Sequence, residues 1–206
     1  MLTKKQLKIF EPFTGNIFGE YSYKELKELA KEKSSNAFQL AVNKFKYEQL
    51  ITEKKIGTSR LYSLNLKNNM VFYYMAIINE EKLSKQAMKT IDIIKEEVEK
   101  CTLFYSIVIF GSYAESKERK SSDFDVSVFV EKDNEKKKIE AALNSAGLKS
   151  LLKLDSHVIS QNEFLEMLKA DEENLGKEIA RKHLAVHNNQ LFYAVLRKGV
   201  KSGFAV

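Results

Sequence analysis

The chain has 206 residues, 44% of them hydrophobic, and a single cysteine, so it has room for one large or two small domains and cannot form an internal disulfide or a cysteine-based zinc site. Its longest apolar run, Met70 to Ile78, covers only about half of a membrane-spanning helix, and the N-terminus has no signal-peptide hydrophobic region. We therefore expect a cytoplasmic protein with no membrane association.

The excess positive charge is confined to the first third of the chain. Residues 1–67 contain twelve Lys and one Arg against seven Glu, so they carry the whole net charge of +6, and residues 68–206 are neutral. Such segregation favours a polyanion-binding module joined to a neutral domain. A solvated Lys/Glu surface is the alternative.

Three helices are expected before the first strand. The first ends at Gly15, the second begins with a capping box formed by Ser22 and Glu25, and the third begins at Ser34 or Ser35. Apolar residues at helical spacing are expected to face the core: Leu7, Phe10, Phe13, Tyr23, Leu26, Leu29, Ala30, Phe38, Val42 and Phe45.

The opposite face of the third helix is polar. Asn36, Gln39, Asn43 and Lys46 are spaced by three, four and three residues, which places them in one stripe. Asn and Gln side chains can pair with adenine in the major groove, and Lys46 and Lys44 are candidate phosphate contacts. This stripe has the residue types that base reading requires.

A two-stranded hairpin is expected from Ile51 to Leu66, because its apolar residues alternate and Gly57 offers a turn. Lys54, Lys55 and Arg60 would make its tip basic.

Three helices and a hairpin resemble the winged helix-turn-helix family over residues 3–66. The resemblance implies DNA binding through residues 1–67. A small helical domain used for protein contacts is the alternative interpretation.

Residues 68–100 read as a helical connector without obvious chemistry. Its apolar run must be buried, either between the two domains or against a second copy of the chain. A homodimer would suit a DNA-binding module that reads two half-sites, and both arrangements remain open at this stage.

Carboxylates and a tight turn follow the next expected strand. The run 104–110 predicts a buried strand that stops at Gly111 and Ser112, and Asp123 and Asp125 begin another strand. With a period of two, both carboxylates point to the same side. Their repulsion favours a cation between them, and few oxygen ligands suit Mg²⁺ bound with a nucleotide.

The turn can supply phosphate contacts. Gly111 permits close backbone approach, and the amides and hydroxyl at Ser112 can hold a phosphate. Asp155, in the expected strand 151–160, could complete a carboxylate triad, because an acid in an apolar strand needs a partner. His157 shares its face and either borders the site or is a surface histidine.

Strand, Gly-Ser, ten residues, Asp-x-Asp and a later strand Asp resemble the minimal nucleotidyltransferases of the DNA polymerase beta superfamily. The resemblance implies Mg²⁺ and a nucleoside triphosphate, with ATP the expected donor. It also implies that Asp123 and Asp125 bind metal and that Asp155 completes the site. Gly111 with Ser112 would grip the triphosphate.

The chain departs from the family pattern after the Gly-Ser element, where many members have Ala-Arg-Gly and this sequence has Ala-Glu-Ser, with Glu115 in place of Arg. The loss of the Arg weakens the expected grip on triphosphate. The basic residues that follow have two interpretations: they compensate for the missing Arg by binding the triphosphate, or they form an exposed basic loop. They are Lys117, Arg119 and Lys120.

A final helix is expected over residues 173–189, mainly for packing. His183 and His187 lie four apart on it, a spacing that can bind metal, but no third ligand is nearby. Arg181 and Lys182 are further candidates to approach substrate phosphates.

The sequence thus predicts an α+β protein with a winged helix domain (1–67), a helical connector (68–100) and a polymerase beta-like nucleotidyltransferase domain (101–206) built on a mixed sheet flanked by helices. By resemblance, it would transfer a nucleoside monophosphate to an acceptor hydroxyl. The acceptor would be a protein, such as a toxin partner of a toxin-antitoxin pair, or a nucleic acid. The alternative is a nucleotide-sensing transcription regulator without turnover.

Overall fold

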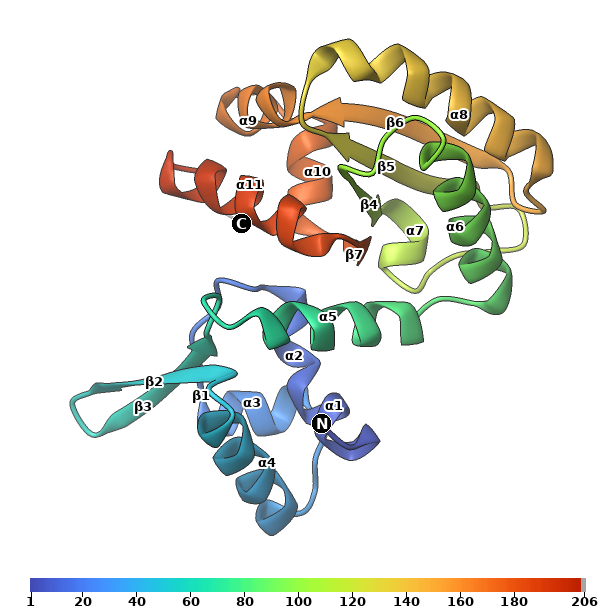
Figure 1. Cartoon of the computed structure of the whole chain (residues 1–206). Helices are drawn as coiled ribbons and strands as arrows, with labels where there is room; N and C mark the ends of the chain where they lie inside the picture. Colours follow the sequence, from blue (N-terminus) through green and yellow to red (C-terminus); the bar gives the residue numbers. More distant parts are fainter. Residues whose placement is uncertain (205–206) are drawn as a thin grey trace. The chain divides into compact units, whose positions relative to one another are not determined.

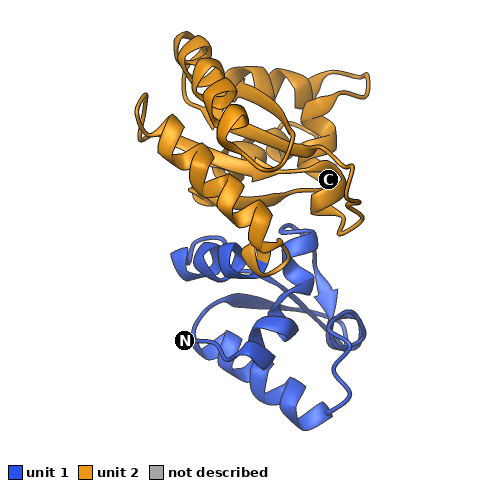
Figure 2. Cartoon of the chain, turned by 90° about the vertical axis from the view of Figure 1, so that its right-hand side faces the viewer, with its two compact units in different colours: residues 1–78 blue, residues 79–206 orange. Residues whose placement is uncertain are grey.

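The structure, a computed structural model, describes residues 1–204, which form two compact units (Figure 2). Unit 1 is Met1–Ile78, and unit 2 begins at Asn79. The division differs from the expected boundaries after residues 67 and 100, because the connector is shared between the units. Neither this segment nor any other described helix is long and apolar enough to cross a membrane.

Unit 1 contains short helices and a small antiparallel sheet with strand order β1-β3-β2 (Figure 1). Its elements are α1 (Lys4–Phe10), α2 (Pro12–Gly15), β1 (Tyr21–Ser22), α3 (Tyr23–Leu29), α4 (Ser35–Tyr47), β2 (Ile51–Ile56), β3 (Ser59–Leu64) and α5 (Asn69–Glu81), which runs past the unit boundary.

Local sequence signals set most of these elements. The Ser22 hydroxyl accepts from the Glu25 N–H and the Glu25 carboxylate accepts from the Ser22 N–H, so the predicted capping box is confirmed. Ser34 caps α4, and the hairpin turns at Gly57, whose φ is +59°. Two details were wrong: Pro12, which has no N–H, begins a separate helix, and Leu29 is 55% exposed instead of buried.

Unit 2 is built around a four-stranded sheet with order β6-β5-β4-β7, in which β5 and β6 are parallel and the other pairs are antiparallel. The predicted mixed sheet flanked by helices is therefore confirmed. The elements are α6 (Lys85–Val98), β4 (Tyr105–Ile109), α7 (Gly111–Ala114), β5 (Phe124–Val130), η1 (Asp133–Glu135), α8 (Lys136–Lys149), β6 (Leu154–Ser160), α9 (Gln161–Lys169), α10 (Leu175–Arg181), β7 (Leu184–His187) and α11 (Asn189–Lys201).

Helices cover both faces of this sheet (Figure 1). On one face, α6 and α8 pack their apolar sides against residues such as Val126 and Val128 of β5. On the other face, Phe129 of β5 packs against Phe164 of α9 and Phe192 of α11, with ring centroids 4.9 and 5.0 Å away. Residues of β5 therefore alternate between two cores, which makes Asp125 and Phe129 face the same side.

The predicted helix over residues 173–189 was wrong in its second half. The helix α10 ends at Arg181, and Leu184–His187 forms strand β7. The reason is tertiary: β7 pairs with β4 and satisfies the free edge of that strand. His183 and His187 consequently do not share a helical face, and α11 follows beyond the predicted end.

Candidate active site

Two carboxylates lie side by side where β5 and β6 begin. Asp125 and Asp155 are direct neighbours in the parallel register of these strands, so their side chains leave the sheet on the same face. Asp155 was expected within an apolar strand, but it is the second residue of β6 and its side chain is 55% exposed. It thus needs no partner for burial and is open to a ligand.

The turn after β4 fits closely around Asp125. Gly111 has a φ of +61°, and a Cβ at this position would lie 2.1 Å from Asp125 Oδ2. The Ser112 backbone N–H donates a hydrogen bond to the Asp125 carboxylate, and the Phe110 N–H donates to the Asp125 carbonyl at 3.1 Å. Only glycine provides both the left-handed backbone and the space that the carboxylate occupies.

Asp123 lies just before β5 and has a lysine partner. The Lys153 ammonium is 2.9 Å from Asp123 Oδ2, and the Phe124 N–H donates to the Lys153 carbonyl at 2.8 Å, which holds the two segments together. Lys153 thus joins the expected pair of Asp123 and Asp125. The sequence pattern did not indicate this lysine.

The environment disfavours the charged form of Asp125. Burial raises the pKa of its carboxyl, the nearby charges of Asp155, Asp123 and Glu178 raise it further, and the hydrogen bond from Ser112 lowers it. Four acidic side chains therefore share one electrostatic environment. A cation among them would relieve this repulsion.

These four acidic residues lie inside a segment whose sequence matches a known protein family. The model of the nucleotidyltransferase domain matches residues 78–187, more than half of the chain. The chain belongs to the nucleotidyltransferase family. It is accordingly a transferase, and the match begins at the boundary between units 1 and 2. No curated protein and no solved structure matches the chain.

The donor set of this nucleotidyltransferase domain fits a hard divalent cation, because carboxylate oxygens are the ligands that such ions prefer. Burial and then the charge of Asp155 raise the pKa of Asp125, and a bound cation would offset both effects. Among residues 1–204, no three His, Cys, Asp or Glu side chains are already grouped as a ready-made ligand set. Lys153 contacts Oδ2 of Asp123, so ligation by all three predicted aspartates would use the other oxygen of Asp123 or require it to exchange this partner.

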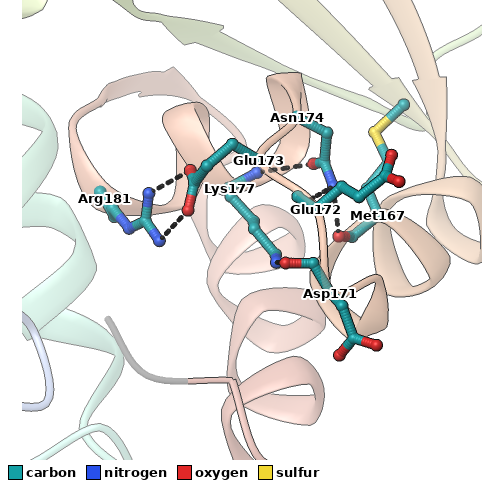
Figure 3. Close-up of polar contacts among 7 residues, drawn as sticks. All are labelled: Met167, Asp171, Glu172, Glu173, Asn174, Lys177 and Arg181. Atoms are coloured by element: carbon teal, nitrogen blue, oxygen red, sulfur yellow. Dashed lines mark hydrogen bonds and ion pairs between the residues drawn. The ribbon is translucent and has the colours of Figure 1, made fainter.

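Beside the Gly111–Ser112 turn, the nucleotidyltransferase domain has a groove of about 820 Å³, here called the α10 groove. Figure 3 shows the polar contacts at the start of α10, which forms one wall. Asn174 caps this helix by accepting from the Lys177 N–H at 3.1 Å, and Arg181 forks onto Glu173 with contacts of 2.6 and 3.0 Å. The wall is thus fixed by its own hydrogen bonds.

Glu115, the departure from the expected family pattern, lines the same groove and contacts two lysines. Lys117 Nζ is 2.6 Å from its carboxylate, and Lys182 forms a second ion pair with it. These partners lower the pKa of Glu115 to about 2, so it is charged at any physiological pH. Of the described residues, Lys117 and Lys182 line the groove, whereas Arg119 and Lys120 do not.

His157 borders the site, as one of the two interpretations expected. Its Nε2 is 3.3 Å from Asp155 Oδ1, and its ring centroid is 5.9 Å from that of Phe110. Sequence reasoning missed Lys153 and Glu178. Their side chains reach the carboxylates through the β5–β6 register and the packing of α10, and no local spacing signals either relation.

In unit 1, the predicted polar stripe is exposed on one face of α4. Asn36, Gln39, Asn43 and Lys46 are exposed, and Gln39 Nε2 donates to Asn43 Oδ1 at 2.9 Å. Lys44 differs from them: its ammonium donates to the Met1 carbonyl at 2.9 Å and pairs with Glu48.

A second groove, of about 590 Å³ and here called the α4 groove, lies between α3, α4 and the hairpin. Lys46 and Arg60 line it, and both pair with Glu53, Arg60 at 2.9 Å. On the hairpin, Lys54 is 3.6 Å from Glu20, and Lys55 is exposed. Much of the predicted basic surface is therefore locally neutralised.

Proposed function

We propose that this enzyme transfers a nucleoside monophosphate from a nucleoside triphosphate, with ATP as the first donor to test, to an acceptor hydroxyl in a magnesium-dependent reaction. The observation that carries the proposal is the pair of carboxylates, Asp125 and Asp155, adjacent in register and packed against the Gly111 turn. Asp123, Asp125 and Asp155 would hold Mg²⁺, which supplies charge stabilisation for the entering and leaving oxygens.

The reaction forms a bond between the acceptor oxygen and the α-phosphorus. The bond from that phosphorus to the oxygen bridging to the β-phosphate breaks, and pyrophosphate leaves with the electron pair. The acceptor proton passes to a base, and Asp155 is suited to this role because its side chain is half exposed beside the partly buried Asp125. Gly111 and Ser112 would orient the triphosphate at the turn.

For the acceptor, we propose a protein hydroxyl, with a toxin partner as one candidate, or the hydroxyl of a nucleic acid. The test is transfer from α-phosphate-labelled nucleoside triphosphates to the protein itself, to extract protein and to RNA. We expect magnesium-dependent label on one acceptor class, abolished in the double variant Asp123→Asn/Asp125→Asn. Equal labelling by the native protein and this variant would contradict the proposal.

We further propose that unit 1 is a winged helix domain that binds DNA. The supporting observation is the α4 groove, where the exposed amides of Gln39 and Asn43 lie beside the hairpin. Binding of a DNA library followed by Gln39→Ala and Asn43→Ala substitution tests it. Loss of about 1–3 kcal/mol per base contact is expected, and unchanged binding by both variants would reject it.

A nucleotide-sensing regulator without turnover is the second candidate, favoured by Glu115 in place of Arg. This candidate predicts tight magnesium-dependent nucleotide binding that alters DNA affinity, without label on any acceptor. The labelling experiment and a DNA-binding titration with and without ATP separate the two functions.

A further inference from the structure

The α10 groove brings together charges from distant parts of unit 2. Glu115 and Lys117 come from the loop after α7, and Lys182 comes from the end of α10, yet the carboxylate of Glu115 contacts both lysines. The lysines are 70% and 62% exposed, whereas Glu115 is only 25% exposed. The glutamate therefore lies on the groove wall in contact with two more exposed cations.

The charges that line this groove balance. Three acidic residues stand against three basic ones, and Arg181 is occupied by the fork onto Glu173. A triphosphate is a polyanion, so it gains nothing from a neutral lining unless the cations change partner. Exposed ion pairs are weak, and a lysine ammonium on its flexible stem can be redirected to a phosphate oxygen at little cost.

The α10 groove also lies next to the carboxylates, where the β- and γ-phosphates of a bound triphosphate could enter it. Gly111 and Ser112 line it at the turn that contacts Asp125, and the lysines lie among its other lining residues. A triphosphate whose α-phosphorus is near the carboxylates would therefore extend its β- and γ-phosphates along the groove toward Lys117 and Lys182.

We propose that Lys117 and Lys182 bind the two phosphates that leave as pyrophosphate, and that Glu115 is a positioning residue that holds these lysines before the nucleotide binds and competes with it. This inference rests on the proposed nucleotidyl transfer. Glu115 thereby sets triphosphate affinity below what the two lysines alone would give. The triphosphate contact expected from an Arg at position 115 is then made by the two lysines.

The test is calorimetric titration of the full chain with ATP in excess magnesium. Glu115→Gln removes the competing charge and should tighten binding about tenfold, and Lys182→Gln should weaken it about tenfold, each corresponding to one charge-assisted hydrogen bond. Glu118→Gln, in the same loop but outside the groove, and Lys169→Gln, on α9, are matched controls expected to leave the affinity unchanged. Thermal unfolding checks that each variant is folded.

A double variant separates competition from a merely structural role. If Glu115 acts through the lysines, the gain from Glu115→Gln shrinks severalfold in the Lys182→Gln background. Full additivity, weaker binding by Glu115→Gln, or no effect of Lys182→Gln would each overturn the inference while native ATP binding left the proposed function standing. A native chain that binds neither ATP nor any of the other three nucleoside triphosphates would overturn both.

Discussion

The position of Gly111 leaves no room for a side chain, since a Cβ there would lie 2.1 Å from Asp125 Oδ2 and φ is +61°. We expect Gly111→Ala to displace the carboxylate and to reduce transfer at least about 100-fold, with about 1–3 kcal/mol of lost stability from backbone strain. Gly57→Ala is a matched control, because Gly57 has a φ of +59° but no atom within 4 Å of the added carbon. Retained transfer in Gly111→Ala would show that the turn does not shape the site.

Asp125 is a residue where stability and activity oppose each other. Its pKa is raised by burial and then by Asp155, so the folded protein binds a proton there more readily than the unfolded chain does. Folding stability therefore falls as the pH rises from the ordinary Asp value through the raised one. We expect Asp125→Asn, in thermal unfolding without divalent metal, to melt higher than the native protein at pH 7.

This advantage of Asp125→Asn should shrink as the pH is lowered, because the native carboxyl becomes protonated. Its transfer activity should fall at least about 100-fold, since metal-assisted charge stabilisation contributes several kcal/mol. Added Mg²⁺ should raise the melting temperature of the native protein only. A variant that melts lower than the native protein at every pH would contradict the assigned electrostatics.

Among the elements, the junction of α10 and β7 buries a histidine. The Nδ1–H of His183 donates to the Ile179 carbonyl at 2.8 Å, and burial lowers its pKa from 6.5 to about 4. Between these pH values His183 is protonated in the unfolded chain and neutral in the folded chain. Folding stability should thus fall as the pH drops through this window, by roughly 2–3 kcal/mol at about 1.4 kcal/mol per pKa unit.

Denaturant unfolding at several pH values measures this decline, with His183→Asn as the comparison. Asn keeps an amide donor and does not titrate, so the variant should be less stable overall but lose most of the slope between pH 6.5 and 4. A native slope that persists unchanged in the variant would place the titration in another group.

Elements with local signals could be predicted, and those set by distant contacts could not. The capping box at Ser22 and the β-branched runs of β4 and β5 carry their information within a few residues. The strand β7 has four residues, and its pairing with β4 joins Leu184 to Ile109 across the sequence, so helical spacing was a misleading guide.

The same distinction applies to the site. Asp123, Asp125 and Asp155 follow from spacing within strands, whereas Lys153 and Lys182 contact acidic partners 30 and 67 residues away. Their pairing depends on the parallel register and on where α10 ends. Sequence spacing could therefore indicate the candidate acids of the site, but not which cations pair with which acids.

For the whole molecule, charge and chemistry are divided between the units. The entire net charge of +6 belongs to residues 1–67, and the nucleotidyltransferase match begins at residue 78. Within each unit, however, one glutamate pairs with two cations that line a groove and neutralises one of their two charges: Glu53 does so for the α4 groove and Glu115 for the α10 groove. The thirteen basic residues of the first 67 thus overstate how much cationic surface is free to meet an anion.

This neutralisation makes the proposed DNA binding by unit 1 testable through its salt dependence. Glu53→Gln releases Lys46 and Arg60, so we expect tighter DNA binding and a slope of log affinity against log salt that steepens by about one to two, at about 0.9 per phosphate contact. Glu32→Gln makes the same change in net charge, but Glu32 pairs with Lys5, which does not line the α4 groove. This variant should therefore change the slope much less. Titration of a fluorescent duplex at several salt concentrations measures both. Equal slopes in the two variants would mean that Lys46 and Arg60 do not contact phosphates, and binding would then depend on net charge alone.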